Sequence, residues 1–152
     1  MLAIGNCIGV LEHSFGPHSG EHRAIEREIV SVEVSRRTKC RYCMSAHSNF
    51  ARQMKMRPDD IQAMREGRPM SDPRHALVQR AARRIWDTQG RLPEEEIKEF
   101  NENGLSVAEL LEVIAVIGWY VTSTLSNNLA RTQIDPEFQY EEEPRDNTHQ
   151  SH

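Results

Sequence analysis

Signals that start and stop helices recur at short intervals along this 152-residue chain and limit the folds open to it. Between them, apolar residues recur every three or four positions, whereas the alternation typical of strands is nearly absent. Proline in a first turn, and glycine after a last one, mark most of the boundaries. Helices are expected over residues 1–15, 21–37, 40–56, 58–67, 73–89, 93–103 and 106–130. The predicted fold is a single-domain, all-α helical bundle of about seven helices.

The last of these stretches is the longest and the least polar. It opens with Ser106 and Glu109 at capping-box spacing, and between Glu112 and Arg131 it carries no charged residue. Residues 110–121 are apolar on nearly every face, which predicts burial on several sides. We therefore expect either a central helix or a subunit interface, and hence a homo-oligomer. The larger aromatic residues of the later helices are interpreted as core side chains: Trp86, Trp119 and Tyr120.

Composition narrows the class of protein. The formal net charge of −4 argues against a nucleic-acid partner, whose binders usually carry a basic face. We expect no membrane span, because no run reaches about 18 apolar residues. Three cysteines, two of them close together, do not resemble a secreted disulfide framework, so a cytoplasmic location is expected. Residues 1–138 are expected to form the domain, and residues 139–152 a disordered acidic tail.

The chemistry is concentrated around Cys40 and Cys43, which two residues separate. This spacing lets two thiols close a small disulfide or bind one metal ion. On a helix that starts near Cys40, both cysteines and His47 lie on one face. The helix N-terminus, together with Lys39 and Arg41, is expected to stabilise a thiolate and to lower the cysteine pKa. His47 can accept or donate a proton for the sulfur of Cys43.

A metal site is the alternative interpretation of the same residues. A closed structural zinc site needs four ligands, and Cys40, Cys43 and His47 supply three. Cys7 or Glu28 could supply the fourth. The cysteine spacing alone therefore leaves redox chemistry and metal binding open.

The wider pattern resembles a known family. Glu28, Cys40, Cys43 and His47 follow the spacing Glu-x11-Cys-x2-Cys-x3-His, with Tyr42 inside the motif. This pattern resembles the AhpD-like (alkylhydroperoxidase) branch of the carboxymuconolactone decarboxylase superfamily, peroxidase-related type. Three further segments agree with it: Met56-Arg57-Pro58-Asp59-Asp60, Gly118-Trp119-Tyr120 and Asn127-Asn128-Leu129. The resemblance covers roughly residues 5–138 and implies an all-helical fold that assembles as trimers or as hexamers built from trimers.

The resemblance also implies an activity, the reduction of hydroperoxides by thiol chemistry. By this analogy Cys43 attacks the peroxide, Cys40 resolves the sulfenic acid as a disulfide, and Glu28 and His47 form a proton relay. Tyr42 is a candidate substrate-binding residue, at a position where the best-known AhpD proteins carry histidine. The implied partners are a hydroperoxide and a dithiol or protein electron donor. No cofactor or metal is expected beyond the Cys40–Cys43 disulfide.

Three hypotheses follow from these residues. The first is a thiol-dependent peroxidase or disulfide reductase acting in antioxidant defence. The second is a non-enzymatic redox-sensing or metal-binding module that uses the same cysteines. The third, a decarboxylase with incidental cysteines, is disfavoured because the decarboxylase branch of the family lacks the pair. The first hypothesis requires Glu28 to lie within hydrogen-bonding or one-water reach of His47 or Cys43.

Overall fold

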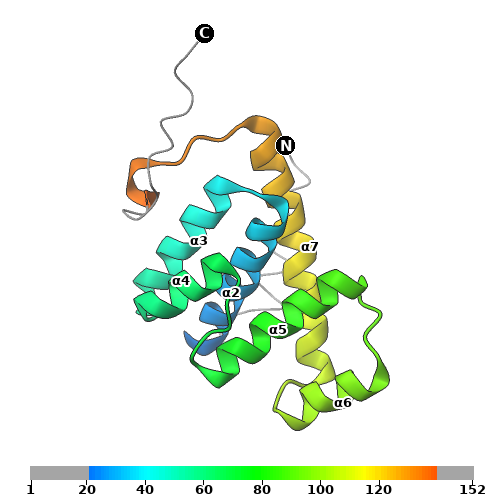
Figure 1. Cartoon of the computed structure of the whole chain (residues 1–152). Coiled ribbons are helices and arrows are strands. Elements are labelled where there is room, and N and C mark those ends of the chain that lie inside the picture. The colour runs from blue at the N-terminus through cyan, green and yellow to red at the C-terminus, as the bar shows by residue number, and fades with distance from the viewer. Residues whose placement is uncertain (1–20, 140–152) are drawn as a thin grey trace.

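The computed structural model describes residues 21–139, and within them every regular element is a helix (Figure 1). The elements are α2 (Glu21–Thr38), α3 (Arg41–Gln53), α4 (Pro58–Glu66), α5 (Pro73–Thr88), α6 (Glu94–Glu102), α7 (Val107–Ala130) and the short 3-10 helix η1 (Pro136–Phe138). The predicted all-α class is confirmed. The helix expected over residues 1–15, and all but Gln139 of the tail expected over residues 139–152, lie outside the described residues.

The helices begin where the sequence indicates, because the capping groups are present. The Asp72 carboxylate accepts a hydrogen bond from the backbone N–H of His75 at the start of α5. At the start of α7, Ser106 and Glu109 form the predicted capping box, each side chain accepting from the other residue's backbone N–H. These local bonds satisfy amide groups that a helix start otherwise leaves without partners.

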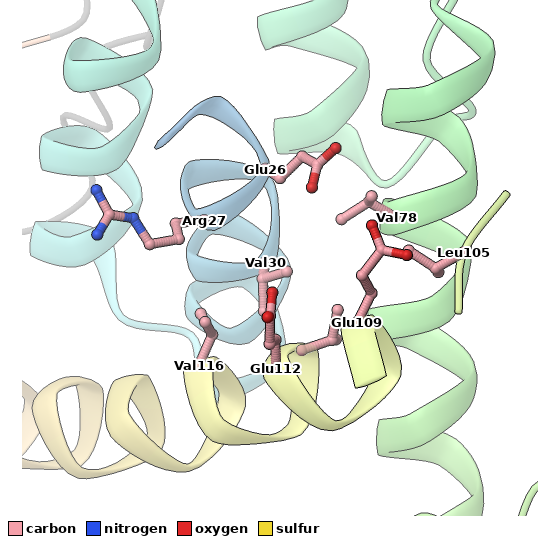
Figure 2. A pocket seen from close by; sticks show the side chains of 9 residues that line it. Glu26, Arg27, Val30, Val78, Leu105, Glu109, Glu112 and Val116 are labelled. Carbon is pink, nitrogen blue, oxygen red and sulfur yellow. The ribbon is translucent and has the colours of Figure 1, made fainter. Parts of the chain in front are cut away.

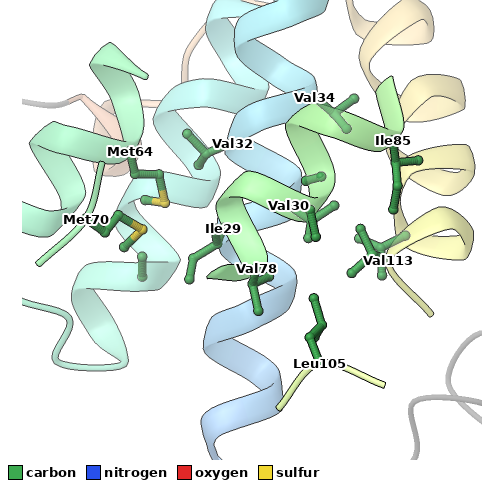
Figure 3. Close-up of a cluster of buried hydrophobic side chains, with 14 of the residues drawn as sticks. Ile29, Val30, Val32, Val34, Met64, Met70, Val78, Ile85, Leu105 and Val113 are labelled. Carbon is green, nitrogen blue, oxygen red and sulfur yellow. The ribbon is translucent and has the colours of Figure 1, made fainter. Parts of the chain in front are cut away.

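The central helix is α2, which lies among α3, α4, α5 and α7. Eight consecutive residues of α2, Glu28–Ser35, are buried, so neighbours cover its whole circumference. Figure 3 shows its side chains Ile29 and Val30 meeting Val78 of α5 and Val113 of α7. This packing forms the hydrophobic core and holds the C-terminal end of α2 in a fixed position.

The polar side chains buried on α2 all have partners. Ser31 and Ser35 donate to backbone carbonyls one turn back, with O···O distances of 2.6 and 2.7 Å. The Glu33 carboxylate accepts from Arg36, Arg37 and Arg83. Burial acts to raise the pKa of Glu33, but these guanidinium groups outweigh it and hold the pKa below its ordinary value. An interior helix with charged residues is therefore stable because its charges are paired.

α7 is not a central helix, contrary to one of the two expectations. Only one side of it is buried, through Leu110, Val113, Val116 and Thr124, which pack toward α2 and α5. The opposite side, here named the outer face of α7, exposes Val107, Leu111, Ile114, Leu125 and Leu129. The apolar sequence of α7 thus reflects an uncovered apolar surface as well as core packing.

By length and composition alone, α7 could span a membrane, contrary to the expectation that no segment could. α7 contains an 18-residue window with a mean hydropathy of 1.4, of which 22% is buried. No other helix among the described residues passes this criterion. Length and composition alone do not separate such a helix from one at a core or at a subunit interface.

Candidate active site

The turn between α2 and α3 delivers Cys40 to its position. Lys39 adopts the left-handed backbone region, with φ +56°. Its N–H donates to the carbonyl of Arg36 (3.3 Å), and the N–H of Cys40 donates to the carbonyl of Ser35 (2.9 Å). This is the Schellman pattern of a helix end. Because it closes α2 within one residue, Cys40 becomes the N-cap of α3 directly after it.

The two cysteine sulfurs lie side by side in the interior. Cys40 and Cys43 are 1% and 2% exposed, and their Sγ atoms are 2.7 Å apart. The backbone N–H of Cys43 also donates to Cys40 Sγ, at 3.3 Å. Both are free thiols in the structure. A disulfide bond of about 2.05 Å would need only a small movement of one side chain.

The thiol of Cys43 is hard to ionise. Burial, then the hydrogen bond with Cys40 and the charge of Cys40, raise its pKa to about 12. Hydrogen bonds from Asn127, whose Nδ2 lies 3.4 Å from Cys43 Sγ, and from Ser123 act in the opposite direction. For Cys43, the pKa lowering expected from the helix N-terminus is therefore wrong. The first-turn N–H is directed at Cys40 instead, and Cys43 keeps its proton at neutral pH.

Glu28, from the middle of α2, and His47, one turn after Cys43 in α3, form a largely buried pair. Glu28 Oε2 of α2 lies 2.7 Å from His47 Nδ1 of α3, with the two side chains 7% and 11% exposed. The predicted contact between them is confirmed. Because the carboxylate engages Nδ1, the second ring nitrogen is left to exchange a proton elsewhere. Figure 1 shows α2 and α3 side by side and antiparallel, which brings these distant positions together.

Two residues of α7 belong to the site and were not assigned to it from sequence. The ring of Tyr120, interpreted as a core residue, meets the His47 ring edge-on with centroids 4.6 Å apart. Burial and then the nearby charge of Glu28 raise the pKa of Tyr120. Asn127 donates to Cys43. Tyr120 and Asn127 are seven positions apart and so share a helix face. Polar groups on one face of an otherwise apolar helix are the sequence feature that could have assigned both residues to the site.

Tyr42 points toward the C-terminal segment of the domain. Its hydroxyl donates to the Asp135 carboxylate (3.0 Å), and its ring packs edge-on against Phe138 of η1 at 6.2 Å. Burial, then this hydrogen bond, raises the pKa of Tyr42. Tyr42 therefore holds η1 against α3, and its expected role in substrate binding stays a prediction.

Two cavities lie near these helices. The larger, of about 300 Å³, is lined by Arg36, Lys39, Arg41 and Arg65 together with Ser35, Cys40 and Met44, and is named here the basic cavity. The smaller lies among α2, α5 and α7, beside Val30, Glu109 and Glu112 (Figure 2). Its volume of about 30 Å³ has room for roughly one water molecule. Of the two, only the basic cavity reaches a cysteine.

The described residues do not bring together a donor set for a metal ion. Within residues 21–139, no three side chains of His, Cys, Asp or Glu are grouped so that they could hold one. Cys40 and Cys43 point their sulfurs at each other, and the Nδ1 of His47 is taken by Glu28. Cys7, the other ligand considered from sequence, lies outside the described residues.

Residues 19–84 match the model of the carboxymuconolactone decarboxylase family. The matched stretch contains Glu28, Cys40, Cys43 and His47, so the four positions of the predicted motif all lie inside it. This match confirms the predicted resemblance to the superfamily over residues 19–84, and the AhpD-like branch stays a prediction.

A solved structure shares the fold. It is the crystal structure of an uncharacterized peroxidase-related protein from a Silicibacter species, with a TM-score of 0.69 and 19% sequence identity. The similarity covers 90% of this chain and 70% of that one. At this identity the likeness establishes the helical arrangement that this chain shares with it. No curated protein matches the chain in sequence.

Proposed function

We propose that this protein is a thiol-dependent oxidoreductase that reduces hydroperoxides through Cys40 and Cys43. The observation that carries the proposal is the buried pair of sulfurs 2.7 Å apart. The two helices that meet at these cysteines, α2 and α3, also hold the Glu28–His47 pair. The match of residues 19–84 to a family that includes enzymes agrees with a catalytic role. Two adjacent thiols suit the reaction because the second traps the sulfenic acid before it oxidises further.

In the first step, the sulfur of Cys43 attacks one oxygen of the hydroperoxide and the O–O bond breaks. The proton of the Cys43 thiol passes to His47, one helical turn further along α3, and then to the leaving alkoxide, which departs as an alcohol. Cys43 is left as a sulfenic acid. Because its pKa is raised to about 12, the thiol needs such a base at the moment of attack.

In the second step, the sulfur of Cys40 attacks the sulfenic sulfur of Cys43. A disulfide forms, and the hydroxyl leaves with the Cys40 proton as water. Two electrons have then passed from the two thiols to the peroxide. An external dithiol returns them by thiol–disulfide exchange. Glu28 acts as a positioning residue, since its carboxylate holds the His47 ring and stabilises the imidazolium form.

The proposal is tested by peroxide consumption with a dithiol donor, using purified single variants. Cys43→Ser should abolish consumption, while Cys40→Ser should leave a sulfenic acid at Cys43 that dimedone traps for mass mapping. Cys7→Ser, which removes the third cysteine, is the matched control and should consume peroxide at the wild-type rate. Consumption by Cys43→Ser at the parental rate would overturn the assignment. A disulfide that forms once without turnover would favour a redox sensor instead.

A further inference from the structure

The basic cavity concentrates positive charge beside one of the two cysteines. Four of its lining side chains are cationic, and among the described residues that line it there is no carboxylate. Cys40 belongs to the lining, whereas Cys43 does not and instead meets Asn127 of α7. A molecule in the cavity would therefore lie next to Cys40 rather than Cys43, and would do so among cations.

The chain keeps these cations in place by specific local structure. Arg36 is held by the buried Glu33 at 2.7 Å, and its guanidinium lies against Gly67, where a side-chain Cβ would come within 2.9 Å of it. Lys39 has a left-handed backbone (φ +56°), a conformation that favours glycine over any L side chain. Arg65 donates to the Ser48 hydroxyl at 3.1 Å. At position 39, local stability alone would favour glycine over lysine.

The size and charge of the cavity indicate its ligand. A volume of about 300 Å³ suits a small molecule, near the lower end of ligand cavities in proteins. Guanidinium and ammonium groups recognise carboxylates through charge-assisted hydrogen bonds. A donor that reduces the Cys40–Cys43 disulfide by exchange at Cys40 must also carry a thiol.

We propose that the basic cavity admits a low-molecular-weight thiol bearing a carboxylate, which reduces the Cys40–Cys43 disulfide by attack at Cys40. The proposal rests on the disulfide chemistry proposed above and names the class of its electron donor. The donor thiolate forms a bond to Cys40 Sγ while the Cys40–Cys43 bond breaks and its electron pair leaves on Cys43. A second donor thiolate then attacks the donor sulfur of the mixed disulfide, which releases Cys40 and an oxidised donor disulfide.

A thiol of high pKa is a slow leaving group, so the surroundings of Cys43 favour the reduced end state and not the rate of its departure. Its pKa of about 12 in the reduced protein means that the leaving thiolate takes up a proton at neutral pH. Protonation of Cys43 opposes closure of the disulfide again, so exchange proceeds toward the free thiols.

The test uses the full chain, oxidised first with diamide so that the disulfide forms without peroxide. Its reduction is followed by stopped flow with mercaptosuccinate, 2-mercaptoethanol and cysteamine, which are anionic, neutral and cationic, compared at equal thiolate concentration. Mercaptosuccinate should react about tenfold or more faster than cysteamine, and the ratio should fall as salt is added. In Cys43→Ser, oxidised mercaptosuccinate should form a mixed disulfide that mass mapping places on Cys40.

Two lysines of the chain provide a matched pair of variants. Lys39 lines the cavity, and Lys55 stands at the other end of α3, also exposed and also with a left-handed backbone (φ +63°). Lys39→Gly should lower the anionic-to-cationic ratio about threefold or more without lowering the melting temperature. Lys55→Gly should leave the ratio unchanged. Lys39→Asn, which keeps a left-handed backbone with less added flexibility, should repeat the Lys39→Gly result.

The outcomes separate this proposal from the proposed function. Failure of diamide to form a Cys40–Cys43 disulfide would count against the function itself. Formation of the disulfide with equal rates for the three thiols, or with a preference for cysteamine, would overturn the anionic donor alone. The proposal would also be overturned if the three thiols showed no charge preference but the reduced protein reacted faster with an anionic than with a neutral hydroperoxide. That result would assign the cavity to the peroxide.

Discussion

Glu28 Oε2 lies 2.7 Å from His47 Nδ1, and the two side chains come from different helices into a site nearly closed to water. A carboxylate in this place stabilises the imidazolium that forms when His47 accepts a proton from a thiol. The pair links the central helix α2 to the helix that carries both cysteines. The first prediction tests whether this link serves catalysis.

Glu28→Gln should slow peroxide-dependent thiol oxidation by about tenfold or more, because the amide keeps the shape but lacks the charge. The rate is measured by stopped flow between about pH 5 and pH 9. The pH profile should change shape as well as height. Glu26→Gln on the same helix is the control, since Glu26 pairs with Arg74 at 2.6 Å and not with His47. Equal slowing by both variants, with unchanged profiles, would indicate a structural role for Glu28.

Cys40→Ser should lower the pKa of Cys43. Burial is the largest cause of its rise to about 12, but the hydrogen bond and the charge of Cys40 are the next two. Removal of the neighbouring thiol leaves burial opposed by the hydrogen bonds from Asn127 and Ser123, so alkylation of Cys43 should begin at a lower pH than in the parent. Mass-mapped alkylation by iodoacetamide, in a Cys7→Ser background, gives the titration curve. An unchanged curve would mean that burial alone sets the pKa.

Asn127→Ala should slow oxidation of Cys43 severalfold, because the Asn127 amide donates to its sulfur at 3.4 Å and acts to lower its pKa. A hydrogen bond worth about 0.5–1.5 kcal/mol corresponds to a factor of roughly 2 to 12 in rate. Ser126→Ala is the neighbouring control, since Ser126 bonds only within α7, to the carbonyl of Thr122. The test would go against the assignment if both alanine variants reacted at the parental rate.

Glu33→Gln should destabilise the fold at neutral pH, by about 1–3 kcal/mol for a buried group that accepts from three arginines. The folded pKa of Glu33 lies below its ordinary value, so its stabilisation is present above about pH 4.5 and is lost as the pH falls through the folded pKa. Urea unfolding at neutral and acidic pH should therefore show a gap between parent and variant that narrows in acid. Glu95→Gln, at an exposed position of α6, should show no such gap.

The sequence was informative where structure is local. Proline at Pro58 and Pro73, and the capping box at Ser106, mark helix starts through groups within one turn, and the observed bounds agree. The Glu28–His47 contact was also predictable, because a helical hairpin with a short turn must bring those positions together. The covering of α2 on all sides was not predictable, because the spacing of its apolar residues is that of an amphipathic helix. Glu33 can be buried because Arg83 of α5 pairs with it, and that partner is distant in sequence. The basic cavity likewise joins Arg36, near the end of α2, to Arg65 of α4, and only tertiary packing determines that meeting.

The outer face of α7 is the basis of the last prediction, which concerns assembly. Leu111, Ile114, Leu125 and Leu129 are 61%, 42%, 54% and 88% exposed. Scattered apolar residues are ordinary on a surface, but several large ones along a single helix indicate a covered face. We expect a second copy of the chain to cover it, in a trimer or in a hexamer of trimers. The solution mass should then be three or six times the chain mass of 17.5 kDa.

Static light scattering of the purified protein at micromolar concentration measures this mass directly. Leu111→Glu combined with Ile114→Glu should reduce it toward that of one chain, because two charges on an exposed helix face oppose burial there and leave the core untouched. Asn101→Lys, on the exposed surface of α6, is the control and should leave the mass unchanged. A wild-type mass near 17.5 kDa would contradict the assembly. Flotation of the wild-type protein with lipid vesicles, lost in the double variant, would instead mean that the apolar face of α7 meets a membrane.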